Sequence, residues 1–295
     1  MSVLSDRLSN LWCQTVKFWA FSLVKREQYQ QIRRNTRWKN RYRGKHCFIL
    51  GNGPSLKDVR FSDLQEEYVF TVNQLMRRED FKDLHANFHL WSDFRFFDVD
   101  PDDEGDQELL RVMRSLNTEG NQPECFIPAD FIDFAKKYGL MDSLRMNFFK
   151  VNLAFYEHFQ EPIDFAKYLP SQASVVVYAI MLAIYMGFEE IYLLGCDTTG
   201  IVVFVKSILQ ANDSADYAYQ LSNAEKARMT KMAENATMEG NARSYWELLR
   251  SYRILYEYCS KRGITLVNCS SSTVIGSIPR AKLSDVLAQK NSDSH

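Results

Sequence analysis

The chain has 295 residues, of which 46% are hydrophobic and 14% aromatic, enough for one substantial core or at most two modest ones. Its net charge of −1 gives no sign of a strongly acidic or basic partner, and no nucleic-acid partner is expected. The average hides a split, because residues 1–46 carry eleven Lys/Arg against two Asp/Glu, a net charge of +9. A basic arm joined to an acidic body is therefore the informative feature.

We interpret residues 1–44 as an amphipathic, basic arm that associates with membranes. Segment 8–24 is apolar and aromatic, but polar residues and Lys17 interrupt it, so it does not form a bilayer-spanning stretch. Its large apolar side chains recur near helical spacing, and Arg and Lys follow densely from Lys25 to Lys45. This pattern predicts a helix lying in the interface of an anionic membrane. The alternative is a terminal helix docked on the body, with a solvated basic end.

After the arm, short apolar runs alternate with helical stretches, which predicts an α/β, Rossmann-like fold with a mostly parallel sheet covered by helices on both faces. The expected strands are His46–Leu50, Tyr68–Val72, Asn87–Trp91, Glu124–Pro128, Phe149–Leu153, Glu190–Leu194 and Thr265–Asn268. The expected helices lie near 107–116, 130–140, 174–187 and 222–262. Residues 45–280 are expected to form one domain with a lid at about 198–225, and residues 281–295 a flexible tail.

Three polar clusters follow expected strands directly: Gly51–Ser55, Asn73–Gln74 and Gly195–Thr199. Open α/β sheets bind ligands outside the carboxyl ends of their strands, so these clusters are candidates for a binding site. In the first cluster, the glycines allow a ligand to approach the main chain, and Asn52 offers an amide between them. Pro54 and Ser55 suit the start of a short helix, whose free N–H groups favour phosphate. The cluster matches neither the G-x-G-x-x-G fingerprint nor a Walker loop.

The segments "ILGNGPSLKD", "FTVNQL" and "VVVYAIMLAIYMGFEEIYLLGCD" resemble, in order and spacing, bacterial sialyltransferases of glycosyltransferase family 42. They also resemble the broader group of sialyltransferase-like and MptE-like proteins from polysaccharide clusters. The resemblance covers about residues 44–200 and extends more loosely through "YRILYEYCSKRGITLVNCS". It implies a Rossmann-like nucleotide-sugar fold, CMP-activated donors and a metal-independent reaction, so no metal or other cofactor is expected.

The resemblance also implies roles for individual residues. Asn52 would contact the donor phosphate or sugar, and Asn73 and Gln74 the sugar. Ser174 and Asp197, with the neighbouring Gly195 and Thr198, would lie on the nucleotide side of the cleft. In the sialyltransferases, two lid tyrosines stabilise the leaving phosphate, and Tyr217 and Tyr219 fall in the corresponding region of this chain.

Two departures from that family concern catalysis. The family's lid carries a histidine base, but no histidine occurs here between His158 and His295. The family's arginine before the Ser/Thr-rich helix start is replaced by Gln172 in "SQASV". The general base is therefore unassigned, with Asp93, His85 and His89 as substitutes near another strand end.

An acidic loop at residues 96–107 raises the question of a metal site. Asp98 and Asp100 have the spacing of the D-x-D motif found in metal-dependent glycosyltransferases. The whole loop is acidic, however, which favours a solvated turn over a metal site. As a calcium loop it lacks glycine at the sixth position and Glu at the twelfth. The prediction is that no metal binds.

The sequence thus predicts an inverting, metal-independent glycosyltransferase that moves a sugar from a nucleotide donor to a lipid-linked or core oligosaccharide. One alternative is an MptE-like pyrophosphokinase that needs ATP and magnesium. Another is a non-catalytic membrane-bound partner of a polysaccharide assembly machine. No signal peptide is expected, and six scattered cysteines favour a reduced, cytoplasmic protein on the inner face of the membrane. A homo-oligomer is left open.

Overall fold

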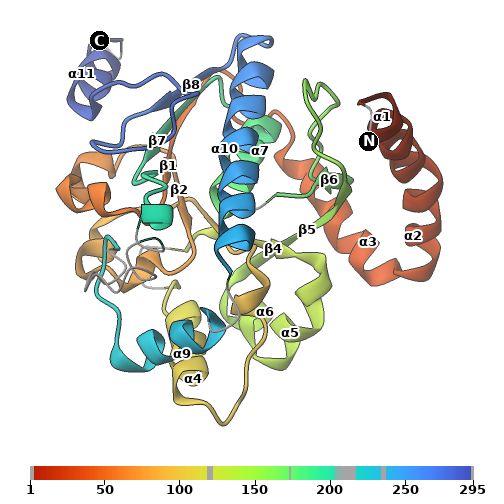
Figure 1. The fold of residues 1–295 in the computed structure, drawn as a ribbon, viewed down its shortest axis with the longest axis horizontal. Helices are drawn as coiled ribbons and strands as arrows, with labels where there is room; N and C mark the ends of the chain where they lie inside the picture. The colour runs from red at the N-terminus through yellow and green to blue at the C-terminus, as the bar shows by residue number, and fades with distance from the viewer. Residues whose placement is uncertain are drawn as a thin grey trace.

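The computed structural model describes residues 3–117, 122–172, 174–202, 205, 217–233 and 237–293. Its centre is an eight-stranded sheet in the order β6-β5-β4-β3-β2-β1-β7-β8, and every neighbouring pair of these strands is parallel (Figure 1). The strands are β1 (His46–Leu50), β2 (Val69–Val72), β3 (Phe88–Leu90), β4 (Glu124–Pro128), β5 (Arg145–Leu153), β6 (Tyr168–Pro170), β7 (Glu190–Leu194) and β8 (Thr265–Asn268). The predicted α/β, Rossmann-like fold is confirmed.

The two faces of the sheet bury separate apolar clusters, and helices cover both. On one face lie α7 (Val175–Met186) and α10 (Met238–Ser260), which pack on residues such as Ile49 and Phe70. On the other face lie α3 (Arg26–Arg33), α4 (Glu104–Arg114), α5 (Ile132–Lys137) and α6 (Leu140–Ser143). Helix α7 is apolar on all sides, and all of its residues except Ile184 are buried, as expected for a helix inside the core.

Several elements differ from the expected ones. Strand β6 was missed, because three residues are too few to show an alternating pattern. Strand β5 begins at Arg145, four residues before the apolar run that predicted it. The single helix expected over 222–262 is two helices, α9 (Asn223–Ala233) and α10, and residues 234–236 lie outside the described residues.

The N-terminal arm forms α1 (Val3–Trp12), a π-helical turn (Cys13–Lys17), α2 (Phe18–Val24) and α3. It packs against the edge of the sheet at β6, where the ring of Tyr168 lies 5.1 Å from Phe18 and 5.5 Å from Phe21 between centroids. Asn10 lies 1% exposed at this contact and donates to the carbonyl of Ala154 at 3.0 Å. One face of the arm is therefore docked on the body.

The last residues also pack on the body. Residues 281–295 were expected to form a flexible tail, but helix α11 spans Leu283–Asp293. Val286 is buried, and the ammonium group of Lys290 lies 2.5 Å from a carboxylate oxygen of Glu190. These contacts explain why the segment is helical despite its polar composition.

A substitution at Asn35 can test whether the basic segment that precedes β1 is part of the folded domain. Its side chain is fully buried, and its amide donates to the carbonyls of Phe148 at 2.7 Å and Phe165 at 2.9 Å. We expect Asn35→Ala to lower the free energy of unfolding by roughly 1–3 kcal/mol, because both carbonyls lose a buried donor. Urea unfolding would measure this loss, with the exposed α3 position Gln30→Ala as control. Equal urea midpoints for Asn35→Ala and Gln30→Ala would contradict the conclusion that this segment is part of the folded domain.

Candidate functional site

The candidate site lies at the point where the order of the strands reverses, between β1 and β7. The chain leaves β1 and adds β2 to β6 on one side, then returns through α7 to place β7 on the other side of β1. The connections after β1 and β7 therefore lead away from a common gap at the carboxyl edge of the sheet. This is the position at which open α/β sheets bind ligands. It brings Gly51–Ser55 and Gly195–Thr198 together.

Glycines allow these two loops to touch through their main chains. A Cβ on Gly51 would lie 2.4 Å from the carbonyl oxygen of Gly195, and one on Gly53 would lie 2.6 Å from the carboxyl carbon of Asp197. Gly195 has φ of +61°, the left-handed region that disfavours other residues. The two glycines are therefore needed for the contact between the loops. Both also line the larger cavity described below, and the expectation that a ligand approaches their main chain stays a prediction.

Ser55 and Asp197 join the same loops through side chains. The backbone N–H of Ser55 donates to Asp197 Oδ2 at 2.7 Å, and the Ser55 hydroxyl donates to Oδ1. Asp197 is fully buried and Ser55 is 7% exposed. The pair therefore stabilises the loops against each other.

Two adjoining cavities open at this edge. The larger, of about 480 Å³, includes among its lining the predicted residues Gly51, Asn52, Gly53, Pro54, Asn73, Ser174, Gly195, Asp197, Thr198 and Tyr217. The smaller, of about 240 Å³, includes Asn52, Asn73, Gln74, Asp93, Tyr217 and Tyr219. Ser55 lines neither of them. Asn52, Asn73 and Tyr217 line both cavities and mark the boundary between them.

Asn52 and Asn73 carry the clearest sign of a ligand. The side-chain oxygen of each is buried, yet it has no hydrogen-bond partner within the described part of the chain. Leaving a buried acceptor unpaired costs about 1–3 kcal/mol, so such groups call for an explanation. Both residues line the two cavities, where a ligand bearing hydroxyl or amide donors would satisfy them.

His89 holds Asn73 in its unusual conformation. Asn73 has φ of +55°, and its carbonyl lies 3.1 Å from His89 Nε2. The other ring nitrogen lies 2.7 Å from the hydroxyl of Thr71. Because burial lowers the pKa of His89 to about 3, the ring is neutral and donates to Asn73 while accepting from Thr71. His89 is thus a positioning residue with both nitrogens occupied, and does not suit the role of general base.

The N-terminus of α7 forms another wall of the larger cavity. Ser174 caps the helix by accepting from the N–H of Val176 at 3.2 Å. Burial raises the pKa of Tyr252 well above its usual value, while hydrogen bonds with Ser174 and Thr198 act in the opposite direction. Tyr252 on α10 therefore ties the start of α7 to the loop after β7.

Tyr217 and Tyr219 lie together at the cavities. Their rings stack with centroids 5.5 Å apart and planes inclined by 18°. Burial raises the pKa of both phenols, so each keeps its proton near neutral pH and can donate a hydrogen bond. Of the lid expected over 198–225, residues 203–204 and 206–216 lie outside the described residues.

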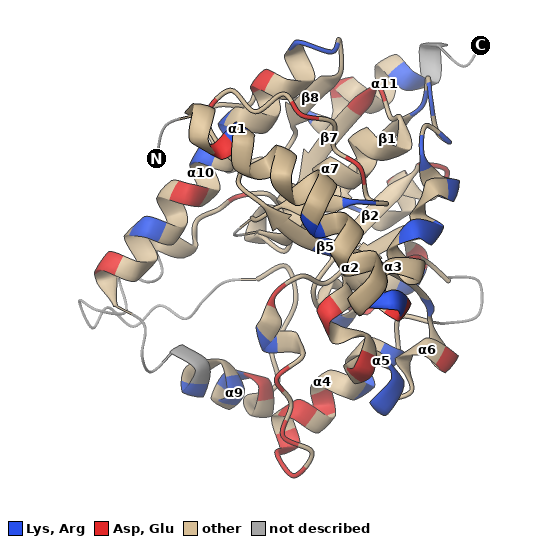
Figure 2. Ribbon diagram, turned by 90° about the vertical axis from the view of Figure 1, so that its right-hand side faces the viewer, with Lys and Arg blue, Asp and Glu red and all other residues tan. Residues whose placement is uncertain are grey.

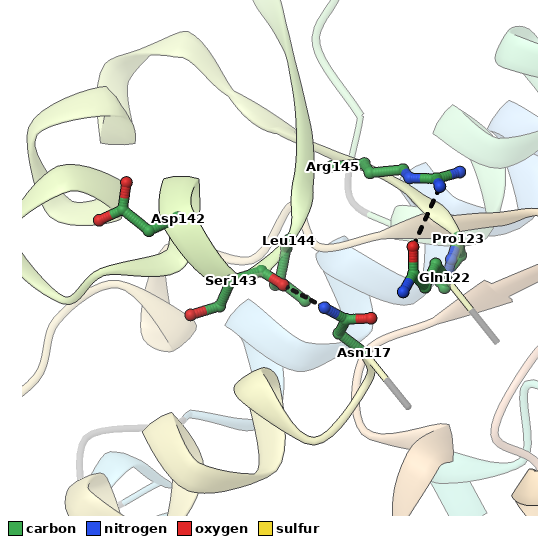
Figure 3. A pocket seen from close by; sticks show the side chains of 7 residues that line it. All are labelled: Asn117, Gln122, Pro123, Asp142, Ser143, Leu144 and Arg145. Carbon is green, nitrogen blue, oxygen red and sulfur yellow. Dashed lines mark hydrogen bonds between the residues drawn. The ribbon is translucent and has the colours of Figure 1, made fainter. Parts of the chain in front are cut away.

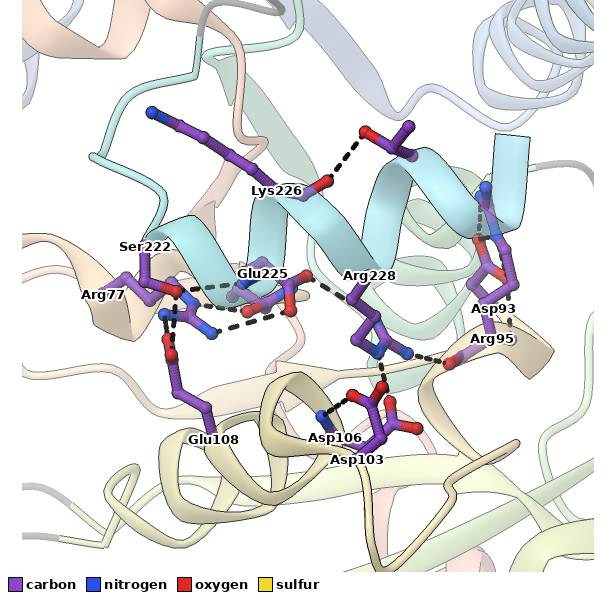
Figure 4. Close-up of polar contacts among 12 residues, drawn as sticks. Arg77, Asp93, Arg95, Asp103, Asp106, Glu108, Ser222, Glu225, Lys226 and Arg228 are labelled. Atoms are coloured by element: carbon purple, nitrogen blue, oxygen red, sulfur yellow. Dashed lines mark hydrogen bonds and ion pairs between the residues drawn. The ribbon is translucent and has the colours of Figure 1, made fainter. Parts of the chain in front are cut away.

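A buried ion network includes Glu225 and Arg228, which line the smaller cavity (Figure 4). Arg77 pairs with Glu108 of α4, and Arg228 of α9 pairs with Asp106 of α4 and, at 3.4 Å, with Glu225 of α9. The side chain of Glu225 is 1% exposed, so these charges lie in a low-dielectric environment and depend on one another. The network fastens α9 to the body.

Two of the residues predicted from the sequence, Gln74 and Asp93, already bind other protein groups near this network. Gln74 donates to Glu225 at 2.7 Å and accepts from Arg77, so its amide already has protein partners. Asp93 caps the turn that follows it and pairs with the guanidinium of Arg95. Both side chains reach the smaller cavity, but Gln74 mainly holds the ion network in place.

Several lining residues were not predicted from the sequence: Arg95, Phe96, Glu225, Arg228, Tyr245, Leu248 and Tyr252. Tyr245, Leu248 and Tyr252 recur at spacings of three and four on α10, a pattern that also fits an ordinary core-facing helix. The sequence offered no sign that this face borders a cavity. Glu225 and Arg228 were missed because Arg77 and Asp106, with which they pair, are distant in the chain.

No group of three or more His, Cys, Asp or Glu within the described ranges could hold a metal ion.

A cavity of about 170 Å³, lined by Asn117, Gln122 and Arg145 among others, lies at the amino ends of β4 and β5 (Figure 3). It lies at the opposite edge of the sheet from Asn52 and has no part in the candidate site.

No family model and no curated protein matches this chain. Two structures of the sialyltransferase CstII from Campylobacter jejuni, in complexes with cytidine-5'-monophosphate and with CMP-3FNeuAc, are 15% and 16% identical, with TM-scores of 0.44 and 0.36. The alignments cover 81% and 80% of this chain, and 86% and 84% of those chains. The MAf glycosyltransferase from Magnetospirillum magneticum AMB-1 is 14% identical, with a TM-score of 0.46 over 91% of this chain and 41% of that one. Similarity at this level assigns neither a family nor an activity.

The buried neutral ring of His89 predicts a pH dependence. The unfolded chain protonates this residue near pH 6.5, whereas the folded protein resists protonation down to about pH 3. The neutral ring of His89 therefore makes its full contribution to the free energy of unfolding above pH 6.5. Below that pH the contribution falls by about 1.4 kcal/mol per pH unit. We expect His89→Gln to flatten the decline in unfolding free energy between pH 6.5 and 5, and the exposed control His85→Gln to preserve it. The same slope in His89→Gln as in wild type would show that the ring is not neutral.

Proposed function

We propose that this chain is a glycosyltransferase that moves a sugar from a nucleotide donor to an acceptor saccharide. The observation that supports it best is the pair of buried amide oxygens of Asn52 and Asn73, which have no hydrogen-bond partner among the described residues and lie at the switch point of a parallel sheet. Neutral amides can bind sugar hydroxyls without attracting an ion in their place. A CMP-activated sugar is the favoured donor because of the three sequence motifs that resemble family 42.

In the proposed mechanism, the sugar is transferred in a single inverting displacement. The acceptor hydroxyl loses its proton to a base and attacks the anomeric carbon, while the bond to the donor phosphate breaks. Tyr217 and Tyr219 line the smaller cavity, and their protonated hydroxyls would donate hydrogen bonds to the leaving phosphate. The free N–H groups at the start of α7 would favour the same negative charge.

Asp93 is the proposed general base, because its carboxylate lines the smaller cavity beside Asn73. Its oxygens accept from Arg95 at 2.9 Å, so Arg95 would have to move or share the carboxylate as the acceptor binds. Arg95 is on an exposed turn with 54% of its side chain accessible, which leaves room for such a movement.

Asn52→Ala tests the donor site. CMP at about 100 times its dissociation constant should stabilise the wild type by about 2.7 kcal/mol and raise its melting temperature by several degrees, at on the order of 2–4 °C per kcal/mol. Asn52→Ala should lose most of this shift without losing intrinsic stability, because its oxygen has no described hydrogen-bond partner. Asn117→Ala, in the distant cavity of Figure 3, serves as the control and should keep the shift.

Other outcomes separate the alternatives. A lower melting temperature for Asn52→Ala with an unchanged ligand shift would assign Asn52 a structural role. A shift with UDP but none with CMP would overturn the choice of donor. A shift that requires both ATP and magnesium would favour the MptE-like pyrophosphokinase, and no shift with any nucleotide would favour the non-catalytic partner.

A lipid-linked or core oligosaccharide of surface polysaccharide assembly is the proposed acceptor, with the enzyme held on the cytoplasmic face of the membrane. Support comes from the outer face of α1 and α2, where large apolar side chains are exposed: Val3, Leu4, Leu8, Leu11, Trp12, Val16, Trp19, Leu23 and Val24. Figure 2 colours α2 tan, since none of its residues is charged. Arg7, Lys17, Lys25 and Arg26 are exposed along the same segment and complement anionic lipid. No helix within the described residues is long and apolar enough to cross a bilayer.

The arm can be tested with matched charge insertions. We expect the protein to co-sediment with phosphatidylglycerol vesicles and to be released by high salt, because lipid charge and basic residues attract each other over about one Debye length. Leu8→Glu/Trp19→Glu should abolish sedimentation, whereas Ser9→Glu/Ala20→Glu, which adds the same charge at exposed positions without large apolar side chains, should reduce it less. Equal sedimentation of the two double variants would argue against insertion of the apolar face.

A further inference from the structure

A third cavity lies beside the candidate donor site and has no role in the proposals above. It has a volume of about 330 Å³ and is lined by Phe155, Ser171, Gln172, Trp246, Glu247, Arg250 and Ser251. Phe155 follows β5 and Ser171 follows β6, so this cavity opens at the same carboxyl edge of the sheet as the donor site. Its size falls within the usual range of small-molecule sites, about 300–1,000 Å³.

Helix α10 separates this cavity from the larger one. Tyr245, Leu248 and Tyr252 line the larger cavity, whereas Trp246, Glu247, Arg250 and Ser251 line the third. Residues three and four apart share one face of a helix, so the two sets occupy adjacent faces of the same two turns. The connection from β6 to α7 also borders both cavities. Gln172 lines the third cavity, and Ser174 lines the larger one. A molecule in the third cavity would therefore lie next to a donor bound at Ser174.

Trp246 gives the third cavity an aromatic wall. The residue is 61% exposed, unusually accessible for so large an apolar residue in a folded body. The guanidinium of Arg250 lies 5.6 Å from the ring centroid. Arg250 is itself held by Glu157, with Nε 2.6 Å from Oε1, and by the carbonyl of Phe155 at 2.8 Å. These contacts fix the guanidinium that supports the ring.

Gln172 supplies the polar counterpart. Both its side-chain oxygen and its side-chain nitrogen are buried, and neither has a hydrogen-bond partner among the described residues. An amide without partners on either atom can donate to and accept from hydroxyl groups at once. Glu247 of α10 also lines the cavity and adds an exposed carboxylate that can accept hydrogen bonds.

We propose that this cavity binds one pyranose ring of the acceptor saccharide. The C–H face of a pyranose is apolar and packs on an indole, while its hydroxyls satisfy the amide of Gln172 and the carboxylate of Glu247. The third cavity adjoins the start of α7, whereas Asp93 lines the smaller cavity, so the ring bound at Trp246 is a neighbour of the acceptor ring whose hydroxyl reacts. This inference depends on the proposed glycosyltransferase function for its role, but the binding of a saccharide can be measured without it.

Saturation-transfer NMR with methyl β-D-glucopyranoside, methyl β-D-galactopyranoside and methyl α-D-mannopyranoside tests the proposal. We expect wild type to transfer saturation to the ring C–H protons of at least one of these glycosides. Trp246→Ala should weaken its binding at least about tenfold, equivalent to about 1.4 kcal/mol, and Gln172→Ala should also weaken it. Trp19→Ala removes an equally exposed tryptophan, at 66%, from the arm and should leave binding unchanged.

The CMP-induced melting shift is measured on the same variants. Trp246→Ala and Gln172→Ala should keep it, which shows that they are folded and that the donor site is intact. Absence of saturation transfer to all three glycosides, or equal transfer in wild type and Trp246→Ala, would overturn the saccharide site. Saccharide binding that depends on Trp246, in a protein without a CMP shift, would uphold this site and overturn the donor proposal instead.

Discussion

The close approach of the loops after β1 and β7 is the constraint on which the rest of the site depends. Parallel pairing aligns the carboxyl ends of the two strands, and the Gly51 and Gly53 backbones then lie against Gly195 and Asp197. A side chain at either glycine would force the loops apart. The Ser55–Asp197 pair adds hydrogen bonds to the same contact. Because this contact is rigid, Asn52 between the glycines is held at the cavity instead of turning toward solvent.

Two helices extend this constraint into a binding surface. Helix α7 starts at the cavity and passes through the core, so its N-terminus is fixed by nearly complete burial. Helix α10 packs beside it and borders the larger cavity with one face and the third cavity with the next. A small rotation of α10 would change both cavities together. A ligand in either cavity would therefore contact the same helix.

Helix α9 is attached differently, by charges in place of apolar packing. Its Glu225 and Arg228 connect to Arg77 and to Asp106 through a buried network of ion pairs. Such a network depends on every member, since removing one leaves another charge buried without compensation. Tyr217 and Tyr219, which precede α9, line the smaller cavity with Asn52 and Asn73. The N–H of Ala218 between them donates to the carbonyl of Asn52 at 3.2 Å, so a backbone hydrogen bond also holds this segment at the site.

Local patterns were enough to predict the strands of the inner sheet, the α7 helix with its Ser174 and Gly187 ends, and the polar clusters at three strand ends. These features follow from periodicity and turn chemistry within a single segment. Contacts between distant segments were needed to show that the glycines touch another loop, that His89 is a buried neutral support for Asn73, and that Gln74 belongs to an ion network. It also placed Tyr245, Tyr252 and Trp246 at cavities. The physical reason is that burial, pKa and hydrogen-bond partnership arise between segments far apart in the chain, and no local pattern of residues specifies them.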